Sequence, residues 1–192
     1  MSKVGIYGGT FDPIHIGHLI TAQSVRELRE LDKIIFIPAF LSPHKLDIKA
    51  SSPKHRINML KLAIESVDFF DISEFEIKQK QISYTIDTLN ELKKHYDELE
   101  LIIGYDNIFK FYTWKDPDEI LKLAKLVVLK RRSSYPPPYE DKYYNQAEFV
   151  QTRGIEISAT DLRERVKHGQ PINYLVTKEV KDYIFEHNLY KE

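Results

Sequence analysis

Short apolar runs alternate with longer segments of helical periodicity along the chain, and no other feature narrows the choice of fold as much. The runs expected to be strands are residues 4–7, 33–37, 70–77, 99–103 and 126–130, with a last short strand within 149–157. Helical patterns cover residues 19–31, 84–95, 118–125, 158–168 and 177–187, and another begins at Ser52-Pro53. Strands buried on both faces and separated by helices form a parallel sheet, so the sequence predicts an α/β fold.

The boundaries of several elements are marked by residues with defined backbone preferences. Pro53 suits the first position of a helix, and Gly169 and Asn188 are expected to end the two closing helices. Residues 131–145 are predicted to be a polar loop, with an extended, exposed run at Pro136-Pro137-Pro138. No linker or internal repeat divides the chain, so we expect a single domain over 1–192, with 158–192 as a C-terminal helical part packed on it.

Composition excludes several classes of chemistry. The 192 residues contain no Cys, which rules out disulfides, thiolate nucleophiles and zinc sites built on Cys. The formal net charge of −1 argues against a nonspecific nucleic-acid coat but leaves room for a small anionic ligand. No signal peptide and no apolar run long enough for a bilayer is present, so the sequence predicts a cytoplasmic protein without membrane contact.

The end of the first expected strand carries the densest chemical signal, Gly8-Gly9-Thr10-Phe11-Asp12-Pro13-Ile14-His15-Ile16-Gly17-His18. The paired glycines let backbone N–H groups approach a phosphate, and His15 and His18 fall in the first turn of the next helix. A helix N-terminus already favours anions, so two imidazoles there could donate to one oxyanion. Taken singly, a Gly-Gly pair is usually a turn and a His is usually structural, and two His alone could hold a metal.

A second signal lies near the end of the chain, in Ile157-Ser158-Ala159-Thr160-Asp161-Leu162-Arg163. Ser158 is expected to cap a helix, with Asp161 three positions on. The helix start would offer N–H groups, the Thr160 hydroxyl and the Arg163 guanidinium to phosphate oxygens. Considered alone, this segment is equally compatible with an ordinary capped helix.

Together the two motifs resemble the nucleotidyltransferases that carry T/H-x-G-H and I-S-S-T-x-I-R, and within them the bacterial nicotinate-nucleotide adenylyltransferase family. Further matching segments are Ser42-Pro43-His44-Lys45, His55-Arg56-Ile57-Asn58-Met59-Leu60, Ser83-Tyr84-Thr85-Ile86-Asp87-Thr88, Ile103-Gly104-Tyr105-Asp106 and Asn188-Leu189-Tyr190. The resemblance spans essentially the full length. It implies a Rossmann-like open parallel sheet of nucleotidyltransferase type.

The resemblance also implies a reaction and a set of ATP contacts. AMP would pass from ATP to nicotinate mononucleotide with release of pyrophosphate, with Mg²⁺ held mainly by the ATP phosphates rather than by a protein carboxylate cage. The implied catalytic residues are His15, His18, Lys45 and Arg163. The implied ATP contacts are Gly8, Gly9, Thr10, Phe11, Gly104, Asp106, Ile157, Ser158 and Thr160. For Asp106 alone, a role as a helix cap remains an alternative.

For the acceptor, the resemblance implies that Trp114, the only Trp, stacks on the pyridine ring. Thr85 and nearby backbone N–H groups would receive the carboxylate, with Tyr84 and Lys115 as further contacts. The sequence departs from the family pattern at Ala159, where Ser is usual, and at Lys115, where an aromatic is common. Ala159 removes one hydroxyl from the second motif, and Lys115 places a cation in the acceptor region.

Other readings remain open on the sequence alone. A related nucleotidyltransferase could use nicotinamide mononucleotide or phosphopantetheine, and a nucleotide-binding sensor would perform no chemistry. The presence of His15, where phosphopantetheine adenylyltransferases usually carry Thr, disfavours that acceptor. The expected partners are small molecules, and a homo-oligomer is left open.

Overall fold

The computed structural model describes residues 2–41, 50–130 and 140–191. In these ranges the strands are β1 (Lys3–Gly9), β2 (Lys33–Pro38), β3 (Phe70–Ile72), β4 (Glu98–Gly104), β5 (Lys125–Lys130) and β6 (Glu148–Gln151). The longer helices are α1 (Ile16–Arg29), α2 (Pro53–Ile64), α4 (Thr85–Leu92), α6 (Pro117–Leu123), α8 (Ala159–Lys167) and α9 (Lys178–Glu186). Shorter turns of helix are α3 (Phe75–Gln79), α5 (Tyr105–Ile108), η1 (Phe111–Thr113) and α7 (Lys142–Gln146).

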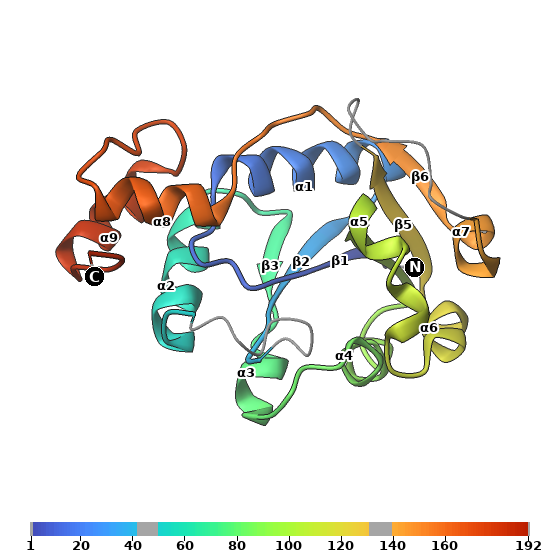
Figure 1. Ribbon diagram of the computed structural model, residues 1–192. Helices are drawn as coiled ribbons and strands as arrows, with labels where there is room; N and C mark the ends of the chain where they lie inside the picture. The colour runs from blue at the N-terminus through green and yellow to red at the C-terminus, as the bar shows by residue number, and fades with distance from the viewer. Residues whose placement is uncertain (1, 42–49, 131–139, 192) are drawn as a thin grey trace.

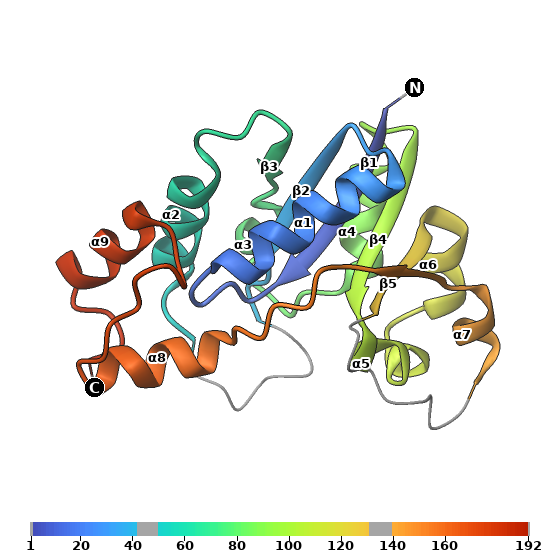
Figure 2. The same ribbon diagram turned by 90° about the horizontal axis from the view of Figure 1, so that it is seen from above.

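The strands form a six-stranded sheet in the order β3-β2-β1-β4-β5-β6, and each neighbouring pair is parallel. This is the doubly wound order, in which the chain reverses direction across the sheet between β1 and β4. The predicted Rossmann-like parallel α/β fold is therefore confirmed. Figures 1 and 2 show α1 lying along one face, with α4 and α6 on the other.

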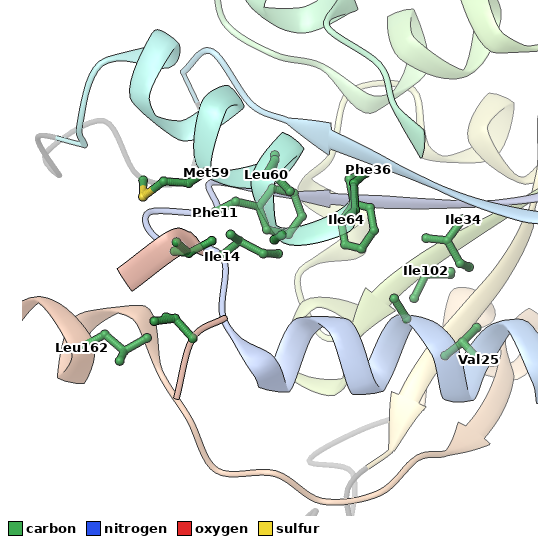
Figure 3. Close-up of a cluster of buried hydrophobic side chains, with 14 of the residues drawn as sticks. Phe11, Ile14, Val25, Ile34, Phe36, Met59, Leu60, Ile64, Ile102 and Leu162 are labelled. Atoms are coloured by element: carbon green, nitrogen blue, oxygen red, sulfur yellow. The ribbon is translucent and has the colours of Figure 1, made fainter. Parts of the chain in front are cut away.

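The inner strands alternate their side chains between two hydrophobic clusters, as a sheet covered on both faces requires. In β2, Ile34 and Phe36 face a cluster shared with α1 and α2, whereas Ile35 and Ile37 face one shared with α4 and α6. Figure 3 shows the first cluster, in which Phe11 and Ile14 of the loop after β1 join residues of α2.

The C-terminal helices contribute to the first of these clusters. Leu162 of α8 and Val180 and Ile184 of α9 are fully buried in it. In both views α8 and α9 lie beside α2, and the connection from β6 to α8 crosses from the other edge of the sheet (Figures 1 and 2). Gly169 and Asn188 end the two helices with left-handed backbones, φ +65° and 51°, as predicted.

Two predictions about local structure are wrong. Residues 70–77 were expected to be one strand, but β3 ends at Ile72 and Phe75 begins a helix. A short amphipathic helix and a period-two edge strand can share the same few apolar positions, so the pattern did not separate them. Part of the expected loop 131–145 is α7, which begins because the Asp141 carboxylate accepts the N–H groups of Tyr143 and Tyr144 at 3.0 and 2.8 Å. Pro136–Pro138 lies outside the described residues.

In the described ranges, no helix combines the length and the apolar character that crossing a membrane requires.

Candidate active site

A cavity of about 1100 Å³ opens at the carboxyl ends of β1 and β4. These strands lie at the point where the strand order reverses, and ligands of open α/β sheets bind at such a point. The cavity extends from the loop after β1 and the start of α8 to the first turn of α4 and the segment around Trp114.

This cavity brings together the site residues predicted from the sequence. Its lining includes Gly8, Gly9, Thr10, Phe11, His15, His18, Tyr84, Thr85, Gly104, Asp106, Trp114, Lys115, Ile157, Ser158, Thr160 and Arg163. Lys45 lies outside the described residues. Segments from both halves of the chain therefore meet at one place.

The two histidines form a stacked pair at the start of α1. His15 is the N-cap residue and His18 is at the third helical position, and their ring centroids are 3.6 Å apart with planes inclined by 21°. The His18 backbone N–H donates to Nδ1 of His15, and the His15 N–H donates to Nδ1 of His18, both at 3.3 Å. The pair is thus a reciprocal capping box built from two imidazoles.

These hydrogen bonds decide which ring nitrogen carries the proton. Because each Nδ1 accepts from a backbone N–H, each neutral ring is assigned the tautomer protonated at Nε2. Nε2–H is therefore the donor of both imidazoles, and both residues line the cavity. Two imidazole N–H donors beside a helix N-terminus suit an anion.

The glycines of this loop serve the packing of aromatic and imidazole rings. A Cβ at Gly9 would come within 2.8 Å of the Phe11 ring, and a Cβ at Gly17 within 3.1 Å of Nδ1 of His15. At Gly8 a Cβ would meet no heavy atom within 4 Å, so there the backbone faces open space. Phe11 lines the cavity and is also part of the core cluster, being 3% exposed, with its ring edge-on to His18 at 5.2 Å.

The second motif forms the start of α8 on the same side of the cavity. Ser158 is the N-cap, and its hydroxyl accepts the Asp161 N–H at 3.0 Å, as the sequence predicted. Arg163 is held by two hydrogen bonds, from Nη1 to the Asp12 carbonyl at 2.8 Å and from Nη2 to the Thr160 hydroxyl at 3.2 Å. The Arg163 cation is thus fixed next to the loop that carries the histidines.

After β4 the chain turns directly into the short helix α5. Gly104 occupies its N-cap position and Asp106 lies in its first turn, so the alternative that Asp106 is the cap is wrong. The Asp106 side chain is exposed at the rim of the cavity. A carboxylate at this position can accept hydrogen bonds from a ligand hydroxyl.

The opposite end of the cavity is formed by α4 and the turn after η1. Tyr84 and Thr85, which both line the cavity, are the N-cap and first residue of α4, so the N-terminus of this helix lies at this end. Trp114 is half-buried and packs on Phe111 at 5.1 Å, more enclosed than the loop-like position expected from its neighbours. Nζ of Lys115 lies 4.8 Å above the Tyr84 ring and 3.4 Å from the Asp87 carboxylate.

Sequence reasoning missed a carboxyl group beside this end. Glu76 of α3 lines the cavity, and its Oε1 accepts the hydroxyl of Thr88 of α4 at 2.7 Å. Burial raises the pKa of Glu76, and the nearby Asp87 adds to the rise. In the sequence, Glu76 lies within the apolar segment 70–77, and no local motif distinguishes it.

The polar groups around the two histidines are imidazole, hydroxyl, guanidinium and backbone N–H groups, which can donate hydrogen bonds to phosphate oxygens. In the described ranges no group of three or more His, Asp or Glu side chains is arranged to hold a metal. The carboxylate of Asp12, in the loop that leads to His15, is bonded to the Tyr190 hydroxyl and to the Ser51 N–H. Mg²⁺ binds readily through phosphate oxygens and water with few protein ligands.

Comparison with known proteins agrees with this geometry. The family model described as cytidylyltransferase-like matches residues 6–165. A probable nicotinate-nucleotide adenylyltransferase of Thermoanaerobacter sp. (strain X514) is 42% identical over 99% of this chain and 95% of its own length. One of Clostridium botulinum (strain Alaska E43 / Type E3) is 40% identical over the whole of both chains.

Solved structures share the fold. Nicotinic acid mononucleotide adenylyltransferase of Plasmodium falciparum, complexed with NaAD, superposes with a TM-score of 0.77 at 18% identity over 99% of this chain and 98% of that one. A putative nicotinate-nucleotide adenylyltransferase of Vibrio parahaemolyticus gives a TM-score of 0.70 at 20% identity, over 100% of this chain and 97% of that one. With the full-length identity to the curated relatives, the chain belongs to the nicotinate-nucleotide adenylyltransferase family.

Proposed function

We propose that this protein transfers AMP from ATP to nicotinate mononucleotide, giving nicotinate adenine dinucleotide and pyrophosphate, a step of NAD biosynthesis. The observation that carries the proposal is the single cavity that joins the His15–His18 pair and Arg163 to the Trp114 end. Two anionic nucleotides could bind there with their phosphates meeting near the histidines. The relatives at about 40% identity over the full length carry the same enzyme name.

The phosphate-binding end would take the triphosphate of ATP. Nε2–H of His15 and of His18 would donate to its oxygens, with His18 as the main stabiliser of charge at the α-phosphate. Arg163 would hold the departing pyrophosphate together with Lys45, which lies outside the described residues. Thr160 and the N–H groups around Gly8 add neutral donors.

The reaction needs alignment more than proton transfer. The acceptor is a phosphate monoester whose second pKa is about 6, so it is already largely a dianion at neutral pH. One of its oxygens forms a bond to the α-phosphorus as the bond from that phosphorus to the pyrophosphate oxygen breaks, and no covalent enzyme intermediate forms. The protein brings two anions into line and stabilises the charge on the phosphates, which imidazoles and a guanidinium can do.

Mg²⁺ would accompany ATP and neutralise part of the charge on its phosphates. The residues of this chain bind and orient the phosphates around it.

The remaining cavity residues would hold the two nucleosides. The backbone around Gly104 and the Asp106 carboxylate would contact a ribose, and Ile157 and Ser158 would contact the adenosine half. At the far end, Trp114 would stack on the pyridine ring while N–H groups of the first turn of α4, beginning at Thr85, receive its carboxylate. A pocket end made of N–H donors prefers an acid over an amide, because the amide presents one donor in place of an acceptor.

Pyrophosphate release from ATP tests the proposal directly. The purified chain with Mg²⁺ and ATP is given nicotinate mononucleotide, nicotinamide mononucleotide or phosphopantetheine in parallel reactions. We expect fast release with the first, slower release with the second and none with the third. ATP binding without release in all three reactions would instead identify a nucleotide sensor.

The proposal includes a cytoplasmic location and small-molecule partners only. Whether copies of the chain associate can be read from its mass in solution by light scattering.

A further inference from the structure

Asp12 lies in the loop between the paired glycines and His15, and its carboxylate is bonded within the protein. The residue is 3% exposed. Its Oδ1 accepts the hydroxyl of Tyr190 at 2.6 Å, and its Oδ2 accepts the backbone N–H of Ser51 at 2.9 Å. Three segments that are distant in sequence therefore meet at one buried carboxylate.

The backbone of the same residue anchors the cation at the phosphate-binding end. The Asp12 carbonyl accepts Nη1 of Arg163 at 2.8 Å, and the Thr160 hydroxyl accepts Nη2 of the same guanidinium at 3.2 Å. The location of the Arg163 charge thus depends on where the Asp12 peptide is held. An Arg side chain has several rotatable bonds, and a fixed acceptor reduces the entropy lost when it binds a phosphate.

A buried arginine holds the loop from the other side. Arg56 of α2 is 1% exposed and donates from Nη1 to the Thr10 carbonyl at 2.8 Å and from Nε to the Ser51 carbonyl at 3.1 Å. Its charge is balanced by the nearby Asp12 carboxylate, as a buried ion requires. Arg56 and Tyr190 therefore hold residues 10–12 between them.

We propose that Tyr190 is a positioning residue of the phosphate subsite, which acts by fixing Asp12 and, through the Asp12 carbonyl, the Arg163 guanidinium. The inference rests on the proposed function for the identity of the substrates. It goes beyond that function because Tyr190, a residue outside the cavity lining, would control how well pyrophosphate and the triphosphate are held.

The chain offers a matched control in Tyr183 of α9. Its hydroxyl also ties the C-terminal part to α2, through Nδ1 of His55 at 2.9 Å and Nδ2 of Asn58 at 3.0 Å. Neither of these partners lines the cavity. Tyr183→Phe therefore removes comparable docking bonds without touching the loop that holds Arg163.

The test compares Tyr190→Phe and Tyr183→Phe in the full chain. Calorimetric binding of inorganic pyrophosphate should weaken about tenfold in Tyr190→Phe, the usual effect of losing a hydrogen bond to a charged group, and stay within twofold in Tyr183→Phe. In turnover, Tyr190→Phe should lower kcat and raise the KM for ATP, with the KM for nicotinate mononucleotide nearly unchanged. Asp12→Asn combined with Tyr190→Phe should cost less than the sum of the two single changes, because both weaken one contact.

The outcomes separate the inference from the proposed function. Unchanged pyrophosphate binding in Tyr190→Phe, or an equal loss in Tyr183→Phe, would overturn the inference, since the tyrosine would then serve only to dock the C-terminal helices. A parent chain that binds pyrophosphate but produces no dinucleotide would overturn the proposed function. In that case the binding comparison still decides whether Tyr190 positions Arg163.

Discussion

His18 uses its two ring nitrogens for different tasks. Nδ1 accepts the His15 N–H and so helps to start α1, while Nε2–H is the donor assigned to the α-phosphate. The fold thus sets the tautomer that the proposed chemistry needs. Because the His18 side chain both caps α1 and is the proposed donor to the ligand, removing it affects stability and catalysis together. A substitution that keeps the capping bond can separate the two effects.

His18→Asn separates them, because the Asn amide oxygen lies near the position of Nδ1 but no donor replaces Nε2–H. We expect His18→Ala and His18→Asn to lower kcat by a similar factor of about 10²–10³, the usual effect of removing one preorganised donor. Only His18→Ala should also lower the melting temperature. Steady-state kinetics and thermal unfolding of both variants check this, and a near-normal kcat in His18→Asn would show that Nε2–H is not the stabiliser.

Trp114 offers an aromatic face at the end of the cavity opposite the histidines. Trp114→Ala should raise the KM for nicotinate mononucleotide about tenfold, since stacking of an aromatic side chain on a base contributes roughly 1–3 kcal/mol. The KM for ATP should change little, and Trp114→Phe should recover most of the loss. Tyr112→Ala, a change at an exposed neighbour, is the control. An equal rise in both KM values would place Trp114 outside the acceptor pocket.

Residues whose chemistry is local could be read from the sequence, whereas residues that act through distant partners could not. His15, His18 and Ser158 belong to short motifs in which spacing alone defines a helix start. Asp12 and Tyr190 are joined by a hydrogen bond across 178 positions, and only the fold brings them together. The role of Glu76 likewise depends on burial, which no local pattern reveals.

At the scale of elements, α3 and α4 are joined by a half-buried acid, Glu76, and an ion pair lies beside it. Glu76 bonds to Thr88 of α4, while Glu74, two positions earlier, accepts from Lys61 of α2 at 2.7 Å. Burial raises the pKa of Glu76, and the hydrogen bond and charge of Lys61 lower the pKa of Glu74. Two neighbouring carboxyls therefore respond to pH in opposite directions.

Glu76→Gln and Glu74→Gln should show this difference in chemical unfolding at pH 4 and pH 7. A raised pKa means that Glu76 stabilises the fold most when protonated and less as pH rises through its folded pKa. Glu76→Gln should therefore gain stability relative to the parent between pH 4 and pH 7. The lowered pKa of Glu74 means that its ion pair stabilises the fold at neutral pH and less in acid. Glu74→Gln should therefore become less stable relative to the parent between pH 4 and pH 7. Parallel trends in the two variants would contradict the assignment.

The sequence predicted well those helices whose apolar pattern extends over several turns or whose start is marked by a capping residue. α1, α2, α8 and α9 have both, and β2, β4 and β5 are apolar on both faces. β3 contributes only three residues to the edge of the sheet, where few contacts oppose a change to helix. α5 and η1 span only four and three residues, too few for a helical period to be recognised in the sequence.

At the scale of the whole molecule, the central strands have the cavity at one end and a buried ion network at the other. The cavity lies at the carboxyl ends of β1 and β4, while near their start Glu100 is fully buried between Arg29 and Lys3. Burial alone would raise the pKa of Glu100, but hydrogen bonds from Arg29 and Lys3 outweigh it and hold that pKa below its ordinary value. This ion network joins α1, β1 and β4 without contributing to the cavity.

Arg29→Met should therefore lower stability without lowering activity. Leaving Glu100 with Lys3 alone is expected to cost about 3 kcal/mol, since it uncovers a buried charge. The penalty should shrink as pH falls, because protonation removes that charge, and adding Glu100→Gln should recover part of the loss at pH 7. Denaturant unfolding and pyrophosphate release below the melting temperature are the measurements, and a kcat that falls with stability would contradict the separation of the two ends.

The strand order also bears on how the protein folds. β1 can pair early with β2, its neighbour in sequence, but its other partner is β4, where Lys3 opposes Glu98 nearly half the chain away. Closing so long a loop is a slow step in forming sheets from distant segments.

We also propose that α8 and α9, which share a cluster with α1 and α2, fold as part of the same domain. Because the cavity exists only once β4 has docked on β1, catalytic competence should emerge at the end of refolding, with the rate constant of the final step.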